Sequence, residues 1–169
     1  MFFLYQIILS LITLISPIII LIRVFKNKEH RIRYKEKFGF NSKRRINGKL
    51  IWFHGASVGE ILSIIPLVKN YEKDQSINQI LITSSTISSS KIIKKFKFKK
   101  TIHQFYPIDH IFITQKFLKY WKPNVAIYIE SEIWPSMFNE LERKKIPLIL
   151  LNTRITKKSF NRWKIFSSF

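Results

Sequence analysis

Residues 50–60 read LIWFHGASVGE, and this stretch decides the fold class. Its first four residues are large and apolar without polar alternation, a pattern that predicts a short strand buried on both faces. The apolar run ends before Gly55, and from Ile61 to Val68 apolar residues recur at helical spacing. A buried strand that passes within a few residues into a helix is the unit from which parallel α/β sheets are built.

The same alternation continues toward the C-terminus. Four further apolar runs predict strands at residues 79–83, 103–106, 125–129 and 147–151. Helical spacing predicts helices at residues 61–68, in a Lys-rich stretch that ends near residue 96, and at residues 111–121 and 136–145. In the first helix, Pro66 either causes a kink or lies in the first turn with Ser63 as the N-cap. We therefore expect an α/β domain whose parallel sheet carries helices on both faces.

On the N-terminal side, residues 1–22 contain no charged side chain. As a helix they would be about 33 Å long at ~1.5 Å per residue, enough to span the hydrocarbon layer of a membrane. Residues 23–48 then carry many Lys and Arg, so the positive-inside rule predicts that the rest of the chain is cytoplasmic. We interpret residues 1–22 as an uncleaved transmembrane anchor. The alternatives are a cleaved signal peptide, which needs a basic start and a small-residue cleavage site, and an interfacial helix, which needs a polar face.

The composition limits the partners and cofactors that we expect. The net charge is +20 and 46% of the residues are hydrophobic, so the chain can bury a core and attract a polyanion. The alternative is that the excess of Lys reflects a compositional bias of the solvated surface. No nucleic-acid-binding motif is present, which favours an anionic membrane surface or a phosphorylated substrate as the partner. The sequence has no cysteine and no ligand spacing among its histidines, so we expect no disulfide, no metal and no other cofactor.

A polar loop follows the first predicted strand. In parallel sheets, ligands bind at the carboxyl ends of the strands, where this loop must lie. Gly55 and Gly59 would let its backbone turn tightly and approach a ligand. Glu60 is therefore either a functional carboxylate at this edge or a first-turn acid that interacts with the helix dipole.

Two further loops at the same edge carry charged residues. Glu130 and Glu132 come directly after the apolar strand 125–129. Glu130 therefore faces a cleft or pairs with an Arg or Lys in the sheet edge. Arg154, after the last strand, could bind a phosphate or carboxylate in bidentate fashion, or it could pair with one of these glutamates.

Taken together, these segments resemble the 3-deoxy-D-manno-octulosonic acid (Kdo) transferases, the GT-B glycosyltransferases of lipopolysaccharide biosynthesis. The resemblance runs along all 169 residues and rests on motifs that follow the order of the family. After the apolar N-terminus these motifs are RIRYKEKFGF (31–40), HGASVGE (54–60), PLV (66–68), YPID (106–109), ESEIWP (130–135), IPL (146–148) and NTRITKKS (152–159).

The resemblance implies an inverting transfer of Kdo from CMP-Kdo to a lipid A precursor, without a metal. It implies that Glu60 is the general base and that Glu130 supports it in the active site. The residues that it implies for substrate binding are Ser57, Gly59, Glu132, Asn152 and Arg154.

The resemblance also implies a domain organisation. Residues 49–169 would be the N-terminal, Rossmann-like, acceptor-binding domain of a GT-B enzyme, held on the cytoplasmic face of a bacterial inner membrane by a single span. The second domain of the family, which carries the CMP-sugar site, would be absent, so we expect this chain alone to be inactive. The alternative is an inactive half that acts only as a membrane-surface module binding anionic lipid. One departure is Ser89, which replaces a family glycine where the loop is expected to need a positive φ.

Overall fold

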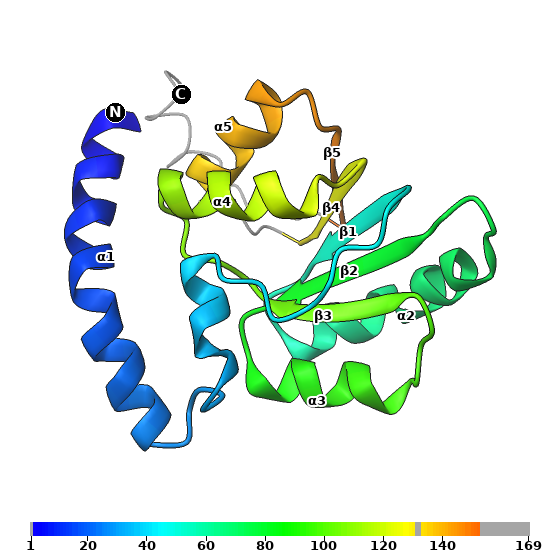
Figure 1. The fold of residues 1–169 in the computed structure, drawn as a ribbon, viewed down its shortest axis with the longest axis horizontal. Coiled ribbons are helices and arrows are strands. Elements are labelled where there is room, and N and C mark those ends of the chain that lie inside the picture. Colours follow the sequence, from blue (N-terminus) through cyan, green and yellow to red (C-terminus); the bar gives the residue numbers. More distant parts are fainter. Residues whose placement is uncertain (1, 131–132, 153–169) are drawn as a thin grey trace.

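The computed structural model describes residues 2–130 and 133–152. Five parallel strands form one sheet in the order β3-β2-β1-β4-β5, as predicted for an α/β fold (Figure 1). The strands are β1 (Leu50–His54), β2 (Gln79–Ser84), β3 (Thr101–Phe105), β4 (Val125–Ile129) and β5 (Leu148–Leu151). All five predicted strands are therefore confirmed, with ends that differ from the predictions by no more than two residues.

Helices cover both faces of this sheet (Figure 1). They are α2 (Val58–Lys73), α3 (Ile87–Lys95), α4 (Ile111–Trp121) and α5 (Pro135–Arg143). Alternate residues of β1 point to opposite faces, so Trp52 packs with the side chains of α4 and α5 while Phe53 packs with those of α2 and α3. The absence of polar alternation in the sequence thus reflects a sheet with two buried faces.

Helix α2 begins earlier and runs longer than the apolar spacing predicted. Its N-cap is Ser57, so the interpretation of Ser63 as the cap is wrong, and Ser63 instead donates a hydrogen bond to the Glu60 carbonyl. Pro66 lies inside the helix rather than in its first turn. The reason is that Ser57 and Glu60 together satisfy the backbone N–H groups at the start of the helix, which extends it toward the strand.

Ser89 does not need the positive φ that the missing family glycine suggested. It lies in α3 with a helical backbone, and its N–H donates to the side chain of Thr86, the N-cap. Its hydroxyl is 2.7 Å from the Thr86 hydroxyl. A serine is therefore accommodated here as part of a helix N-terminus.

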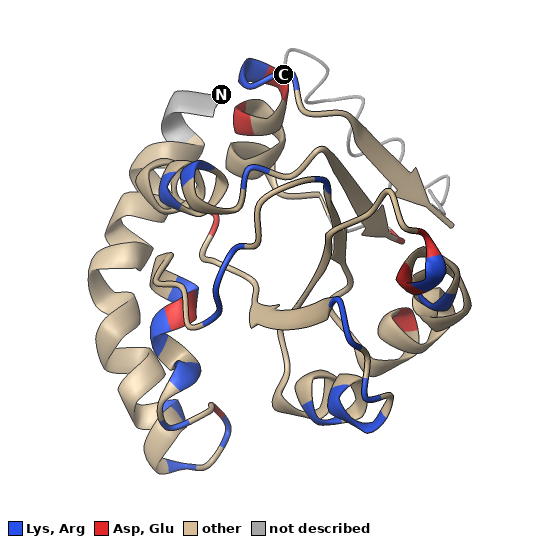
Figure 2. Cartoon of the chain, turned by 45° about the vertical axis from the view of Figure 1, so that its right-hand side comes forward, with Lys and Arg blue, Asp and Glu red and all other residues tan. Residues whose placement is uncertain are grey.

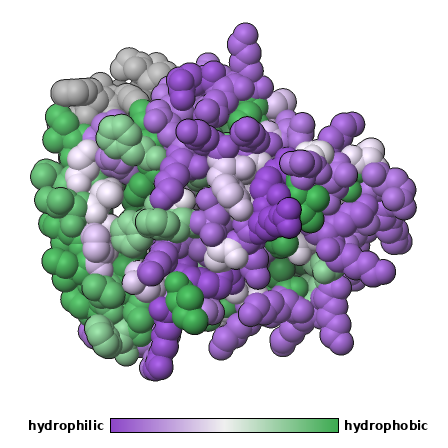
Figure 3. All heavy atoms as spheres, in the orientation of Figure 1, coloured by the Kyte–Doolittle hydropathy of each residue, from purple (hydrophilic) through white to green (hydrophobic). Residues whose placement is uncertain are grey.

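The apolar N-terminal segment forms α1 (Phe2–Phe25), a helix that lies along one side of the domain (Figure 1). Residues 5–25 are long and apolar enough to cross a membrane, a test that a signal sequence would also pass. Only a narrow stripe, including Ser16 and Ile20, is buried against the domain. The outer surface forms a continuous apolar area on that side of the molecule (Figure 3). The exposed residues on it are Ile7, Ile8, Leu11, Ile12, Leu14, Ile15, Ile18, Ile19, Leu21, Ile22 and Phe25.

The basic segment after α1 is fastened to the edge of the sheet by a short 3-10 helix, η1 (Arg33–Phe38). The carboxylate of Glu36 is almost completely buried and accepts two hydrogen bonds from Arg33, at 2.7 and 3.0 Å. It also accepts the N–H of Phe105 in the edge strand β3 at 2.7 Å. Gly39 ends η1 with φ 74°, where a side chain would press on the Ile113 carbonyl.

Candidate active site at the carboxyl edge of the sheet

The sheet has a single point where the connections change face. After β1 and β2 the chain crosses to the face that carries α2 and α3, whereas after β3 and β4 it crosses to the face of α4 and α5. Strands β1 and β4 are direct neighbours, with His54 opposite Tyr128. The loops after these two strands therefore lead to opposite faces of the sheet, and in open parallel sheets the crevice at such a point is where ligands bind.

Glu60 stands on the β1 side of this crevice. Its two carboxylate oxygens accept the N–H groups of Ala56 at 2.8 Å and Ser57 at 3.2 Å. In return, the Ser57 hydroxyl accepts the N–H of Glu60 at 3.3 Å, which completes a capping box. Part of the first-turn interpretation is thus correct: the carboxylate stabilises the start of α2. Two of about four lone-pair positions on the carboxylate are used, so it can still accept a hydrogen bond from a ligand.

The two glycines of this loop have different roles. Neither glycine has a positive φ, so the tight turn that we expected does not depend on the conformational freedom of glycine. A Cβ on Gly55 would come within 3.1 Å of the Glu60 side chain, which means that Gly55 allows Glu60 to pack closely. Gly59 is exposed, and a Cβ added there would meet only the Ser57 hydroxyl at 3.9 Å, so the space around Gly59 is open.

Glu130 stands on the β4 side of the crevice. It directly follows the buried strand, its side chain is exposed, and its φ is 61°. Within residues 5–130 and 133–152, no Arg or Lys forms an ion pair with it, and the predicted alternative partner Arg154 lies outside the described residues. The left-handed conformation is rare for a residue with a side chain and costs of order 1 kcal/mol, as is common at functional sites.

Asn152, another predicted residue, lies further along this edge. Asn152 follows β5 with φ 53° and is exposed. Glu132 and Arg154 lie outside the described residues, so their predicted contributions stay predictions. Among the described residues no three His, Asp or Glu side chains are grouped as metal ligands.

A buried polar cluster lies directly beneath the crevice, and sequence reasoning missed it. The ring of His54 is fully buried and stacks on Tyr106 with 3.9 Å between ring centroids. Its Nδ1 is 3.0 Å from the Thr83 hydroxyl, which itself donates to the Phe53 carbonyl. Thr83 must therefore accept from His54, which places the proton of the neutral ring on Nδ1. Burial lowers the pKa of His54 to about 3. The sequence feature that could have indicated this cluster is a histidine, His54, at the end of a strand that is otherwise apolar.

Asp109 is the second residue whose role only the structure shows. Its buried carboxylate accepts the N–H groups of Ser136 and Met137 at 2.9 and 2.8 Å and so caps α5. It also accepts the hydroxyl of Tyr5 from α1 at 2.7 Å. Burial raises the pKa of Asp109 above its usual range, against the effect of these hydrogen bonds. Asp109 thus links the N-terminal helix to the carboxyl edge of the sheet.

Residues 32–169 match the family described as 3-Deoxy-D-manno-octulosonic-acid transferase (kdotransferase). The chain belongs to the Kdo transferase family. It represents the N-terminal domain of that family, which confirms the resemblance seen in the sequence motifs.

Several Kdo transferases are similar to this chain over nearly its full length. The 3-deoxy-D-manno-octulosonic acid transferase of Rickettsia bellii is 43% identical over 161 residues, 95% of this chain. A probable mitochondrial 3-deoxy-D-manno-octulosonic acid transferase of Arabidopsis thaliana is 38% identical over 164 residues, also 95% of the chain. The Haemophilus influenzae enzyme is 29% identical over 159 residues. The chain spans only 37–38% of the length of these three relatives.

Proposed function

We propose that this chain is the acceptor-binding part of an inverting Kdo transferase with the GT-B fold. The complete enzyme would transfer Kdo from CMP-Kdo to a lipid A precursor in lipopolysaccharide biosynthesis. The chain would supply the acceptor site and the catalytic carboxylate, and the remainder of the enzyme would supply the CMP-Kdo site. Helix α1 would hold it at a bacterial inner membrane with the domain on the cytoplasmic face, where its basic segment meets anionic lipid.

The observation that supports this proposal is that Glu60 and Glu130 follow the neighbouring strands β1 and β4, at the point where the connections change face. A sugar hydroxyl is a poor nucleophile near neutral pH, and a carboxylate held within hydrogen-bond reach can accept its proton. The capping box holds the Glu60 carboxylate in one orientation, and the open space beside Gly59 lets a sugar approach it. Glu130 would act as a hydrogen-bond acceptor that orients the acceptor across the crevice.

The test is the rate of Kdo transfer by Glu60→Gln in a protein that contains both halves of the enzyme. The substitution preserves the size of the side chain and removes its ability to take a proton. We expect the rate to fall about 10²–10⁴-fold, the usual contribution of a general base. A fall of less than tenfold, with acceptor binding intact, would show that Glu60 is not the base.

Glu72→Gln is the matched control. Glu72 lies in the same helix, and its carboxylate also accepts backbone N–H groups, those of Lys99 and Lys100 at 3.0 Å. These contacts lie at the start of β3, at the opposite edge of the sheet from Glu60. We expect the control to lose stability to a similar extent and to retain its transfer rate within about threefold, which separates loss of a cap from loss of a base.

A further inference from the structure

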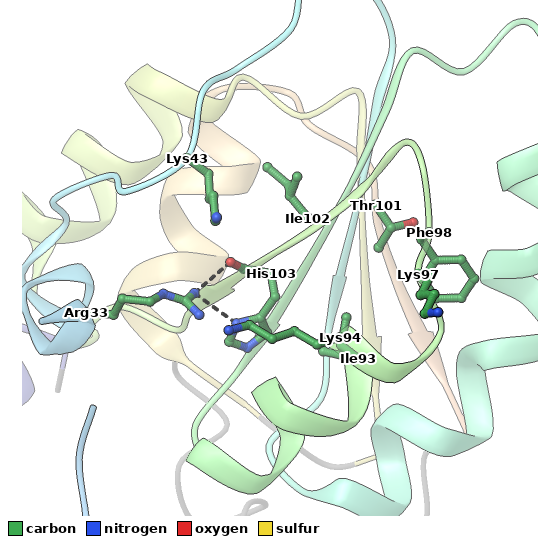
Figure 4. Close-up of a pocket in the computed structure, with 9 residues that line it drawn as sticks. All are labelled: Arg33, Lys43, Ile93, Lys94, Lys97, Phe98, Thr101, Ile102 and His103. Carbon is green, nitrogen blue, oxygen red and sulfur yellow. Dashed lines mark hydrogen bonds between the residues drawn. The ribbon is translucent and has the colours of Figure 1, made fainter. Parts of the chain in front are cut away.

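A pocket of about 210 Å³ opens on the outer edge of the sheet, beside the first half of β3 (Figure 4). It is lined by side chains from segments that are far apart in the sequence: the basic segment after α1, the end of α3 and the start of β3. The basic and titratable residues of the lining are Arg33, Lys43, Lys94, Lys97 and His103. The lining includes neither Glu60 nor Glu130.

Three of these cations converge on one point. In Figure 4 the side chains of Arg33 in η1, Lys43 after η1 and Lys94 in α3 extend toward His103. The guanidinium of Arg33 lies 3.0 Å from the His103 Nδ1 and donates to the His103 carbonyl at 2.7 Å. Burial and the charges of these same three residues hold the pKa of His103 well below its usual range. The ring is therefore neutral, and the positive charge of the pocket comes from the other side chains.

The positive charge is not neutralised inside the pocket. The carboxylate of Glu36 is already engaged by Arg33 and by the N–H of Phe105. In the described parts of the chain, the ammonium groups of Lys43, Lys94 and Lys97 have no carboxylate within ion-pair distance. Lysines that share a concave site repel one another, so the convergence of Lys43 and Lys94 beside Arg33, with no carboxylate of their own among the described residues, favours a bound anion.

Lys97 lies just after α3, and its side chain lines the end of the pocket remote from Arg33 (Figure 4).

We propose that this pocket binds a phosphate group. Lysine ammonium groups are compact point charges that bind phosphate oxygens, and Arg33 retains one N–H after its hydrogen bonds to Glu36, Ser90 and His103. A volume of about 210 Å³ accommodates a phosphate group together with several waters, since water occupies roughly 30 Å³ in the liquid. The phosphate belongs to a lipid head group or to a soluble phosphate, and the two sources present the same chemistry to the pocket.

The experiment measures binding by the full chain in two formats. In neutral detergent, inorganic pyrophosphate is titrated calorimetrically into the protein. In phosphatidylcholine nanodiscs, chemical shifts of the ε-methylene groups of the lysines are compared with and without phosphatidic acid. Lys43→Gln/Lys94→Gln removes two pocket charges. Lys91→Gln/Lys119→Gln is the control, because it removes two exposed charges outside the pocket, one of them on the same helix α3.

We expect the pocket variant to weaken phosphate binding at least tenfold and the control to weaken it less than twofold. Binding of pyrophosphate identifies a soluble phosphate, and a response confined to phosphatidic acid identifies a lipid head group. Equal losses in the two variants, or no binding by the unaltered chain in either format, would overturn the proposal. Neither result depends on Glu60, so failure of the phosphate site is distinct from failure of the proposed catalytic role.

Discussion

At the scale of single residues, the candidate site combines groups that stabilise the fold with groups that are free to act. The Glu60 carboxylate closes the capping box of α2 and keeps accepting capacity for a ligand. Glu130 contributes no ion pair within the described residues and adopts a costly backbone conformation. His54 lies beneath both, and its Nε2 is buried without a hydrogen-bond partner among the described residues.

The burial of His54 predicts a specific dependence of stability on pH. Its folded-state pKa of about 3 lies below the ordinary value near 6.5, so between these values the unfolded chain binds a proton that the folded chain does not. The stability contributed by the neutral ring is complete above about pH 6.5 and is lost as the pH falls toward 3. The loss is about 1.4 kcal/mol per pH unit across most of that interval.

His54→Phe should remove this contribution. Between pH 6 and pH 4, we expect the free energy of unfolding of the variant to fall less steeply than that of the unaltered chain. The difference between the two slopes should correspond to about one bound proton, or about 1.4 kcal/mol per pH unit. Chemical denaturation at a series of pH values in neutral detergent gives both slopes, and other titrating groups cancel in their difference. Above about pH 7 the two slopes should agree. Identical slopes below pH 6 would mean that His54 is protonated in the folded protein.

At the scale of elements, a buried ion pair within η1, Arg33 with Glu36, holds η1 on the sheet through hydrogen bonds to β3. The Glu36 carboxylate accepts hydrogen bonds from the guanidinium of Arg33 and from the N–H of Phe105. Phe105 belongs to β3, which is an edge strand of the sheet. This contact covers part of an edge that would otherwise expose unpaired backbone groups. Lys and Arg recur along the segment that contains η1 (Figure 2). By holding η1 in place, the contact also fixes the backbone from which the basic side chains of η1 extend.

Glu36→Gln should therefore release η1 from β3. Removing the charge leaves Arg33 in a mostly buried position without its counter-ion, and breaking a buried pair in this way costs about 3–5 kcal/mol. We expect a fall of that order in the free energy of unfolding, together with faster tryptic cleavage within residues 26–45. Glu142→Gln, an exposed glutamate on the same molecule, should change stability by less than about 0.5 kcal/mol. Equal effects of the two substitutions would contradict the structural role of Glu36.

At the scale of the whole molecule, α1 and the candidate site lie on the same side. Three side-chain contacts join the first turns of α1 to the carboxyl edge: Tyr5 to Asp109, Gln6 to Ser136 and Ser10 to His110. The outer face of the helix is apolar and exposed (Figure 3). If α1 crosses a bilayer, these contacts must be released, because the hydrocarbon layer, about 30 Å thick, would separate the first turns of α1 from the domain that follows its other end.

Membrane attachment should depend on α1. We expect the full chain to stay in the membrane fraction after washes with high salt and with alkaline carbonate, because burial of its apolar face resists both. A chain that begins at residue 26 should be released by high salt, since its basic segment binds anionic lipid only electrostatically. Retention of the shortened chain after both washes would show that another part of the domain anchors it.

The sequence by itself determined the fold class, the positions of the strands and the family. Five apolar runs that alternate with four stretches of helical spacing were enough to predict the strands, because a strand buried on both faces must be apolar throughout. The residues at the carboxyl edge were also predictable, since parallel strands bring their ends to one edge. Local pattern could not show that Ser57 and Glu60 start α2 together, because an N-cap depends on which hydrogen bonds the folded chain makes.

Only the tertiary structure decided which of these residues meet. The strand order places β1 beside β4, and this puts Glu60 and Glu130 on the two sides of one crevice although 70 residues separate them in the sequence. The same applies to the contact of Glu36 with Phe105 and to the lysines around His103. Such arrangements depend on contacts between distant segments. Their energies arise when the sheet assembles, and no local periodicity in the chain encodes them.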